Sequence, residues 1–176
     1  DYSCLTMAEG LLSANAHNTH VVYDVFFREI PDNGGFAVMS GLSELINELK
    51  NISFSKETLE ELKENGFSKS LIDYLSNFKF SCDVYAVPEG TPVFPNEPIV
   101  KICGPVIEAQ IIETLVLNII NHQTLVATKA NRVVRAAQGK KVIEMGARRA
   151  HGFDSAILGA RAAYIGGVSA TTLYNA

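Results

Sequence analysis

The chain has 176 residues, of which 47% are hydrophobic and 19% are charged, so it can bury one substantial core or two modest ones. Its formal net charge of −4 argues against a general nucleic-acid binder, because such proteins need a net basic face. Three cysteines, Cys4, Cys82 and Cys103, have an odd count and no metal-ligand spacing. We therefore expect reduced thiols, with neither a zinc site nor a disulfide framework.

No part of the sequence predicts a membrane span or an export signal. The most apolar run, residues 111–120, is interrupted by Glu113 and Asn118 and is too short to cross a bilayer. The N-terminal residues lack the basic start and the long apolar stretch of a secretory signal. The expected location is the cytoplasm.

Short elements of mixed type are predicted over the first eighty residues. An amphipathic segment at 5–12 precedes a β-prone stretch at 19–28, which we interpret as one long strand. Apolar residues at helical spacing then predict a helix near 42–49. Ser55 and Ser68 can each cap a further short helix, and the glutamates of the first of these indicate a solvated surface.

A β-rich layer and a long helical region follow. Residues 82–103 alternate β-prone pieces with turns, and four of the six prolines fall there, at positions where no ladder donor is lost. Pro105 suits the first turn of a helical region that Gly139 ends, and we expect a break near 121–123 to divide it into two helices. The second helix carries cations at three-residue steps: Lys129, Arg132 and Arg135.

The last part of the chain predicts one β-α-β step. An apolar strand at 141–146 runs into a turn that carries Arg148, Arg149 and His151. Asp154-Ser155 can cap a helix that ends at Gly166-Gly167, and a second strand follows at 168–172. Guanidinium groups at the end of a strand suit a phosphate-bearing substrate. One such step cannot close a parallel sheet, so we expect the chain to be a fragment.

Five segments, in this order and with this spacing, resemble the nicotinate phosphoribosyltransferase family. They are Asp1–Met7, Val25–Arg28, Val87–Thr91 with Phe94-Pro95 and Glu97-Pro98, Thr128–Ala130, and Gly146–Ala150. The resemblance covers nearly the whole chain, and the order of the segments makes it specific although each string alone is weak.

The resemblance implies an α/β fold, in which an α+β N-terminal layer domain precedes the start of an irregular α/β barrel of the type II phosphoribosyltransferases. We expect the layer domain, with its β-rich segment, at 1–104, the connecting helices at 105–139, and the first β-α-β step of the barrel at 140–176. A barrel of this kind needs about 200 or more residues, so most of it would be absent here.

The same resemblance implies a reaction and its participants. Nicotinate and phosphoribosyl pyrophosphate would give nicotinate mononucleotide and pyrophosphate in NAD biosynthesis, with Mg²⁺ present and ATP hydrolysis coupled to the transfer. The transition state carries positive charge on the ribose and negative charge on the leaving group, so the protein mainly has to place cations and hold the pyridine ring. We expect a cytoplasmic homodimer with shared active sites and with no nucleic-acid or membrane partner. This fragment alone, without the remaining barrel, is expected to be an N-terminal piece that is inactive.

Arg148 and His151 are the expected catalytic residues. Arg148 matches the family's arginine that faces the pyrophosphate, and the alternative is a surface ion pair with Glu144 or Asp154. Arg149 should point the other way if strand geometry persists through the turn, and it either binds substrate or is exposed. His151 either orients the substrate or caps the turn.

The remaining expected site residues bind substrate. Arg28 would reach the neighbouring subunit's phosphate, or it is an exposed cation at a strand end. Tyr2 lies one position before Ser3, which occupies the family's usual ring-stacking position, and Met145 stands where the family often has Phe. Gly146 completes the strand end, and Thr171 and Thr172 either reach the base or ribose or satisfy the sheet edge.

Two relatives and one non-catalytic role remain as alternatives. Quinolinate phosphoribosyltransferase handles a dicarboxylate and calls for a larger basic cluster. Nicotinamide phosphoribosyltransferase would need an acceptor such as a carboxylate where this chain has Thr172. The third alternative is an assembly module derived from one of these enzymes.

Overall fold

The computed structural model describes residues 1–174, which form two compact units. The first unit contains Asp1–Asp24, Ile46–Tyr85 and Lys101–Val116. The second unit contains Val25–Leu45, Ala86–Val100 and the chain from Leu117 onward. Helices and strands are both present, as the expected α/β fold class requires.

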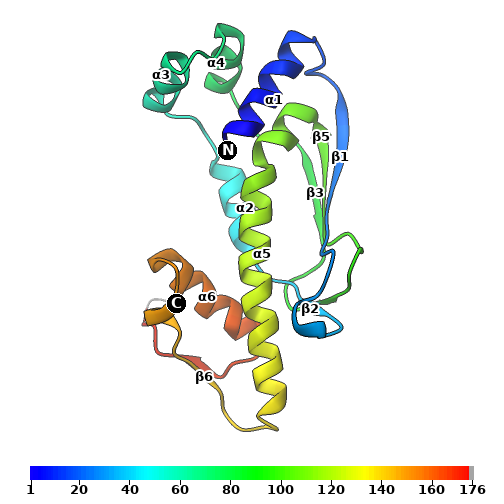
Figure 1. Cartoon of the computed structure of the whole chain (residues 1–176), viewed down its shortest axis with the longest axis vertical. Helices are drawn as coiled ribbons and strands as arrows, with labels where there is room; N and C mark the ends of the chain where they lie inside the picture. The colour runs from blue at the N-terminus through cyan, green and yellow to red at the C-terminus, as the bar shows by residue number, and fades with distance from the viewer. Residues whose placement is uncertain (175–176) are drawn as a thin grey trace. The chain divides into compact units, whose positions relative to one another are not determined.

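Three helices and the start of a fourth enclose the core of the first unit. They are α1 (Tyr2–Ser13), α3 (Lys56–Glu64), α4 (Lys69–Ser76) and the first residues of α5 (Val106–Ala136) (Figure 1). Apolar side chains spaced at helical intervals bring these elements together: Ala8, Leu62, Phe67, Leu71, Leu75, Phe78, Val106 and Ile107. The predicted caps are confirmed, because Ser55 accepts from Thr58 N and Ser68 accepts from Leu71 N.

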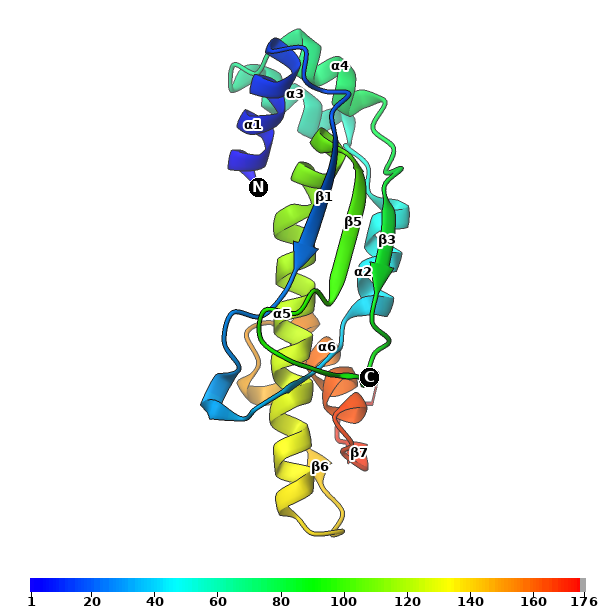
Figure 2. The same cartoon turned by 90° about the vertical axis from the view of Figure 1, so that its right-hand side faces the viewer.

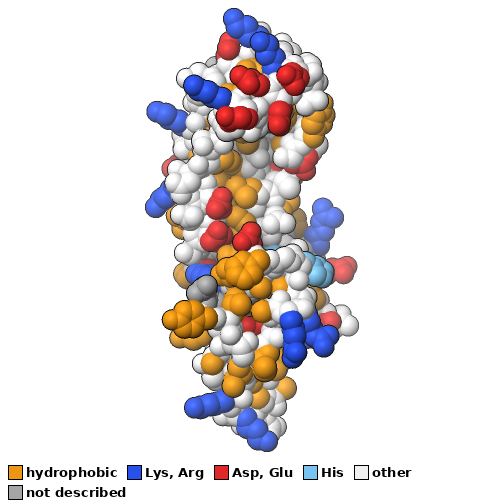
Figure 3. Space-filling view, turned by 90° about the vertical axis from the view of Figure 1, so that its left-hand side faces the viewer, with side chains coloured by type: hydrophobic (Ala, Val, Ile, Leu, Met, Phe, Trp, Pro, Cys, Tyr) orange, Lys and Arg blue, Asp and Glu red, His pale blue; other side chains and the backbone are white. Residues whose placement is uncertain are grey.

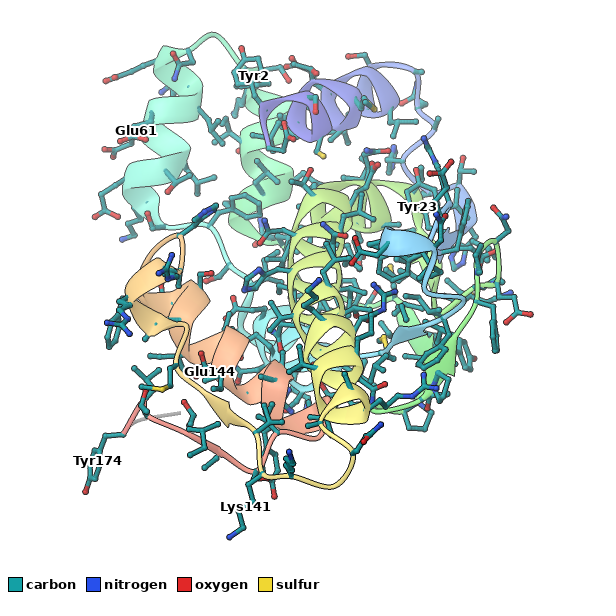
Figure 4. The ribbon with its side chains drawn as sticks, turned by 60° about the horizontal axis from the view of Figure 1, so that its bottom comes forward. Tyr2, Tyr23, Glu61, Lys141, Glu144 and Tyr174 are labelled. Atoms are coloured by element: carbon teal, nitrogen blue, oxygen red, sulfur yellow. The ribbon has the colours of Figure 1, made fainter. Side chains whose placement is uncertain are left out.

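The surface of α3 is acidic. Its four glutamates are all exposed, and acidic side chains gather in one area of the space-filling view (Figure 3). Glu61, for example, extends away from the helix axis (Figure 4). They make no ion pair among those found between the described residues, which fits the predicted solvated surface.

A three-stranded sheet has the order β1 (His20–Val25), β5 (Val100–Pro105) and β3 (Asp83–Ala86) (Figure 2). Two expectations were wrong here. The first strand ends at Val25 rather than at Arg28, and Pro105 is the last residue of β5 rather than part of the following helix. The β-rich nature of residues 82–103 is confirmed by β3, β5 and the two-residue strand β4 (Pro92–Val93).

Helix α5 is continuous, and the expected break near 121–123 is wrong. The helix has neither proline nor glycine over its 31 residues, so Asn121, His122 and Gln123 do not interrupt its hydrogen bonds. Gln123 and Thr124 are fully buried, which means that the polar run marks a packed contact instead of a loop. Helix α2 (Leu42–Asn51) confirms the helix predicted near 42–49.

In the second unit, a short antiparallel pair packs on α5. Strand β2 (Ala37–Val38) pairs with β4, after the 3-10 turn η1 (Pro31–Asn33). Thr128 Oγ1 accepts from Val38 N at 2.9 Å, and Thr124 Oγ1 accepts from Ser40 N at 3.1 Å. These buried hydroxyls satisfy backbone donors that the short ladder leaves unpaired.

The predicted β-α-β step is confirmed in the second unit. Strands β6 (Ile143–Glu144) and β7 (Ala170–Thr171) pair in parallel, with α6 (Phe153–Ile165) between them in the chain (Figure 2). Both strands are much shorter than expected. Ala162 packs with Val38 and Ala127, and Ala163 packs with Ala130 and Val168, so α6 lies against α5 through small side chains.

The start of α6 differs from the prediction. Gly152, with φ of 108°, occupies the N-cap position and no side chain caps the helix, so the expected capping role of Asp154 and Ser155 is wrong. Asp154 lies in the first turn, where its charge still interacts favourably with the helix dipole. The predicted end of the helix at Gly166 is confirmed.

Candidate functional site at the ends of two parallel strands

Glu144, the last residue of β6 (Figure 4), links the carboxyl ends of β6 and β7. One carboxylate oxygen, Oε2, accepts from Thr171 Oγ1 at 2.6 Å, and the other, Oε1, accepts from Gly146 N. The Glu144 carbonyl accepts from Thr172 N at 3.1 Å. Side chain and backbone of one residue therefore hold the edge at which ligands of parallel α/β sheets usually bind.

The two arginines lie on a 3-10 turn that follows this edge. The turn η2 (Ala147–Arg149) is closed by Arg149 N, which donates to the Gly146 carbonyl at 2.8 Å. Strand geometry does not persist through the turn, so the condition under which Arg148 and Arg149 were expected to point in opposite directions is not met. Both side chains are exposed, and among the ion pairs of residues 1–174 neither arginine pairs with Glu144 or Asp154.

Met145, Gly146 and His151 flank the arginines. Met145 is 58% exposed beyond the end of β6, and His151 is exposed between η2 and α6. The N-terminus of α6 has no side-chain cap, so no capping side chain satisfies its first backbone donors. These donors also lie close in the chain to the two guanidinium groups. This segment thus offers several N–H donors, and neither guanidinium group takes part in an ion pair found among residues 1–174, which suits an anion.

The two threonines of β7 differ in what they can offer. The Thr171 hydroxyl donates to Glu144 and accepts from Leu173 N at 3.1 Å, so its proton is already committed. Thr172 is exposed, and its backbone N–H donates to Glu144. Of the two alternatives for these residues, Thr171 thus satisfies the strand end in this structure, while the Thr172 side chain is free to contact a ligand.

Tyr2 and Arg28 lie elsewhere in the chain. Tyr2 belongs to the first unit, where its ring packs against Phe67 with centroids 5.1 Å apart while remaining 61% exposed. Ser3 is engaged locally, because its hydroxyl donates to Asp1 Oδ1 at 2.9 Å. Arg28 belongs to the second unit and is exposed in the bend after β1, consistent with either of its two interpretations.

The predicted cation stripe on α5 is partly neutralised. Arg132 Nη1 pairs with Asp32 Oδ2 at 3.0 Å, Lys129 Nζ pairs with the same oxygen at 3.5 Å, and Arg135 lies 5.6 Å from the centre of the Phe36 ring. These three side chains hold the segment that contains η1. On the same helix, His122 Nε2 lies 3.3 Å from Ser155 Oγ, which is an ordinary polar contact.

The sequence did not predict a second carboxylate that is held by hydrogen bonds, that of Glu89. Glu89 Oε1 accepts from Gly41 N at 2.7 Å, Leu42 N at 3.1 Å and Arg161 Nη1 at 2.9 Å, and Oε2 accepts from Arg161 Nη2 at 2.7 Å. The Arg161 hydrogen bonds are the main cause that lowers the pKa of Glu89, and the same contact raises the pKa of Arg161. The one local signal in the sequence is the position of this acidic residue between Pro88 and Gly90. Its partner, Arg161, lies 72 positions away and could not be predicted from that signal.

Two broader properties of residues 1–174 complete the description. No group of three or more potential His, Cys, Asp or Glu metal ligands is present in that range. None of its helices is long and apolar enough to cross a membrane.

Both the sequence and the fold of this chain are similar to those of known proteins. Residues 1–121 match the model of the nicotinate phosphoribosyltransferase N-terminal domain. A nicotinate phosphoribosyltransferase of Mycobacterium tuberculosis is 41% identical over 169 residues, which cover 96% of this chain and 36% of that protein. One from Bacillus subtilis is 42% identical over 169 residues, which cover 96% of this chain and 34% of that protein.

Solved structures give the same result. The crystal structure of human nicotinic acid phosphoribosyltransferase superposes with a TM-score of 0.92 at 29% identity, covering 98% of this chain and 36% of that chain. A nicotinate-nucleotide pyrophosphorylase from Pyrococcus furiosus gives a TM-score of 0.76 at 27% identity, covering 98% and 37%. The chain spans about a third of the length of these relatives. It belongs to the nicotinate phosphoribosyltransferase family.

Proposed function

We propose that this chain supplies the N-terminal layer and the first barrel step, residues 140–176, of an enzyme that joins nicotinate to phosphoribosyl pyrophosphate and releases pyrophosphate. The observation that carries the proposal is the two guanidinium groups on η2, at the carboxyl edge of β6 and β7, which take part in no ion pair found among residues 1–174. Family membership and the similarity to named nicotinate phosphoribosyltransferases support the choice of substrates.

In the proposed reaction, Arg148 stabilises the charge that develops on the leaving pyrophosphate. Arg149 and the backbone donors of the turn hold the phosphates, and His151 orients them. A planar guanidinium binds phosphate oxygens through paired N–H donors, and such charge-assisted hydrogen bonds strengthen as the leaving group gains charge. Because the displacement occurs at a sugar carbon, the reaction requires no nucleophilic cysteine.

The proposed base site involves Met145, Thr172 and Tyr2, with Thr171 acting only through its contacts at the strand end. A thioether and a tyrosine ring can both contact the face of a pyridine. In a homodimer, Arg28 and Tyr2 would come from the neighbouring subunit and make each site a shared one.

Mg²⁺ and ATP belong to the proposal as participants of the full reaction in the cytoplasm. The described residues do not provide a cluster of carboxylates for the metal, and both oxygens of Glu144 already accept hydrogen bonds. We therefore assign no residue of this chain to Mg²⁺ and no step of the mechanism to either group.

A hybrid enzyme tests the proposal. The 176 residues are joined to the remaining two-thirds of the Bacillus subtilis relative, and product formation is measured with nicotinate, nicotinamide and quinolinate as competing substrates. We expect nicotinate mononucleotide to form with a clear preference for nicotinate. An inactive but folded hybrid, or a preference for either competitor, would contradict the proposed function.

A further inference from the structure

We propose that Glu144 is a positioning residue that sets the backbone of the arginine turn by holding the ends of β6 and β7 together. This inference rests on the proposed function for its catalytic consequence, but its structural part concerns contacts within this chain alone. Neither Arg148 nor Arg149 contacts Glu144 through an ion pair in the described part of the chain, so its role differs from that of a charge partner.

The first step of the argument concerns the weakness of the strand pair itself. β6 and β7 are paired at only two positions, Ile143 with Ala170 and Glu144 with Thr171. So short a parallel ladder leaves its last residues poorly restrained, because each strand end has few ladder hydrogen bonds. The side-chain bridge between Glu144 and Thr171 adds a charge-assisted hydrogen bond at 2.6 Å where the ladder stops.

The second step concerns Gly146, which connects the bridge to the turn. Its N–H donates to Glu144 Oε1, and its carbonyl accepts from Arg149 N at 2.8 Å. The residue is therefore restrained on both sides, with the strand end on one and the arginine turn on the other. A change in the position of the Glu144 carboxylate would be transmitted directly to the backbone that carries Arg148 and Arg149.

The third step concerns the space beside Gly146. A Cβ built on Gly146 would lie 2.7 Å from Glu144 Oε1, so a larger residue would displace the carboxylate that folds back over it. The φ of Gly146 is −83°, which any residue can adopt, so space and not backbone conformation is the constraint. Glu144 and Gly146 therefore form one unit of the site.

The fourth step concerns charge. A carboxylate two residues from a phosphate-binding turn would repel its ligand if its oxygens were free. Here both oxygens accept hydrogen bonds from groups of the strand ends, which disperse the charge and direct it into the protein's own contacts. Because the Thr171 hydroxyl donates its proton to Glu144, it is not a donor for the substrate. The two guanidinium groups remain as the cationic donors.

The structural part is tested on the whole 176-residue chain by NMR. In the wild type, we expect a strongly downfield signal for the Gly146 amide proton. This proton should exchange about 10- to 100-fold more slowly than in Glu144→Gln, because the variant loses the charge-assisted hydrogen bond that the Glu144 carboxylate accepts from it. Glu144→Gln and Thr171→Val should both shift the amide signals of residues 146–150, and Thr171→Ser should not. Glu60→Gln, which removes an exposed carboxylate of α3, is the matched control.

The catalytic consequence is measured in the hybrid enzyme. Glu144→Gln should raise KM for phosphoribosyl pyrophosphate at least tenfold, and by a larger factor than it raises KM for nicotinate. Thr171→Val should also raise KM for phosphoribosyl pyrophosphate, and Thr171→Ser should keep it near the wild-type value. In the double variant Glu144→Gln/Thr171→Val, this KM should be no higher than in the poorer of the two single variants.

The outcomes separate the inference from the proposed function. Wild-type amide signals at 146–150 in Glu144→Gln would overturn the positioning role whether or not the hybrid is active. Altered signals together with an unchanged KM for phosphoribosyl pyrophosphate would overturn its catalytic consequence. An inactive wild-type hybrid with an intact NMR signature would instead contradict the proposed function and leave the Glu144 contacts established.

Discussion

The guanidinium of Arg161 donates to the carboxylate of Glu89 through two hydrogen bonds, 2.9 and 2.7 Å long, one to each oxygen. The same carboxylate accepts from the backbone N–H groups of Gly41, just before α2, and of Leu42, its first residue. One side chain thus connects α6 to the start of α2 within the second unit. Such a bidentate pair fixes geometry as well as charge, and lysine could not replace Arg161 in it.

The stability of the chain should depend on the ionisation of Glu89. Its folded-state pKa is lowered, mainly by Arg161, so its contribution is fully present above the unfolded pKa and disappears as pH falls through the folded pKa. We expect Glu89→Gln to cost about 1–3 kcal/mol at pH 7. Urea unfolding from pH 7 to pH 3 should show the difference from wild type shrinking at the acid end, whereas a difference that grows on acidification would be inconsistent with this sign.

Two glycines of the second unit should respond oppositely to alanine. A Cβ on Gly166 would lie 2.4 Å from the Ala127 carbonyl oxygen and 2.9 Å from Ala130 Cβ, so Gly166→Ala should destabilise by about 1–3 kcal/mol. A Cβ on Gly159, within α6, meets nothing within 4 Å, so Gly159→Ala should stabilise by up to about 1 kcal/mol. Chemical denaturation of both variants checks the pair, and equal effects would argue against the close approach of α5 and α6.

Gly34 and Arg132 should behave as a coupled pair. A Cβ on Gly34 would lie 1.7 Å from Arg132 Nη2, and moving the guanidinium would break its contact with Asp32. We expect Gly34→Ala to cost about 1 kcal/mol in the wild type and close to nothing in an Arg132→Ala background. A double-mutant cycle from thermal unfolding measures this coupling, and additive effects would rule it out.

Cys82 should resist alkylation in the folded chain. Burial and the neighbouring Glu108 carboxylate raise the pKa of its thiol to about 12, so at pH 8 only about one molecule in ten thousand carries the thiolate. Iodoacetamide labelling followed by peptide mass spectrometry should leave Cys82 unmodified until denaturant is added. Glu108→Gln should accelerate labelling, and rapid labelling of the wild type would contradict the burial of this thiol.

Local signals in the sequence were sufficient for part of the fold. Ser55 and Ser68 precede short apolar repeats, and both cap helices as predicted, because a cap and its helix lie within one turn of each other. The break predicted at 121–123 was wrong for the opposite reason. The buried environment of Gln123 depends on residues distant in the chain, and the polar run alone resembled a turn.

The site was only partly predictable for the same physical reason. The position of Arg148 after an apolar strand is visible in the sequence, and the structure places it on a turn at the strand end. The contact of Glu144 with Thr171 joins residues 27 positions apart and follows from the register of β6 and β7. No periodicity fixes that register, since each strand pairs at only two residues.

The most direct test of the account is the binding of phosphoribosyl pyrophosphate by the arginine turn. In the hybrid enzyme, Arg148→Ala should lower kcat/KM for phosphoribosyl pyrophosphate by about 30- to 100-fold, through a raised KM, a lowered kcat or both. Lys140→Ala, which also removes one exposed positive charge, should change kcat/KM less than twofold. Wild-type kinetics for Arg148→Ala, or equal losses in the two variants, would contradict the assignment of this turn to the pyrophosphate.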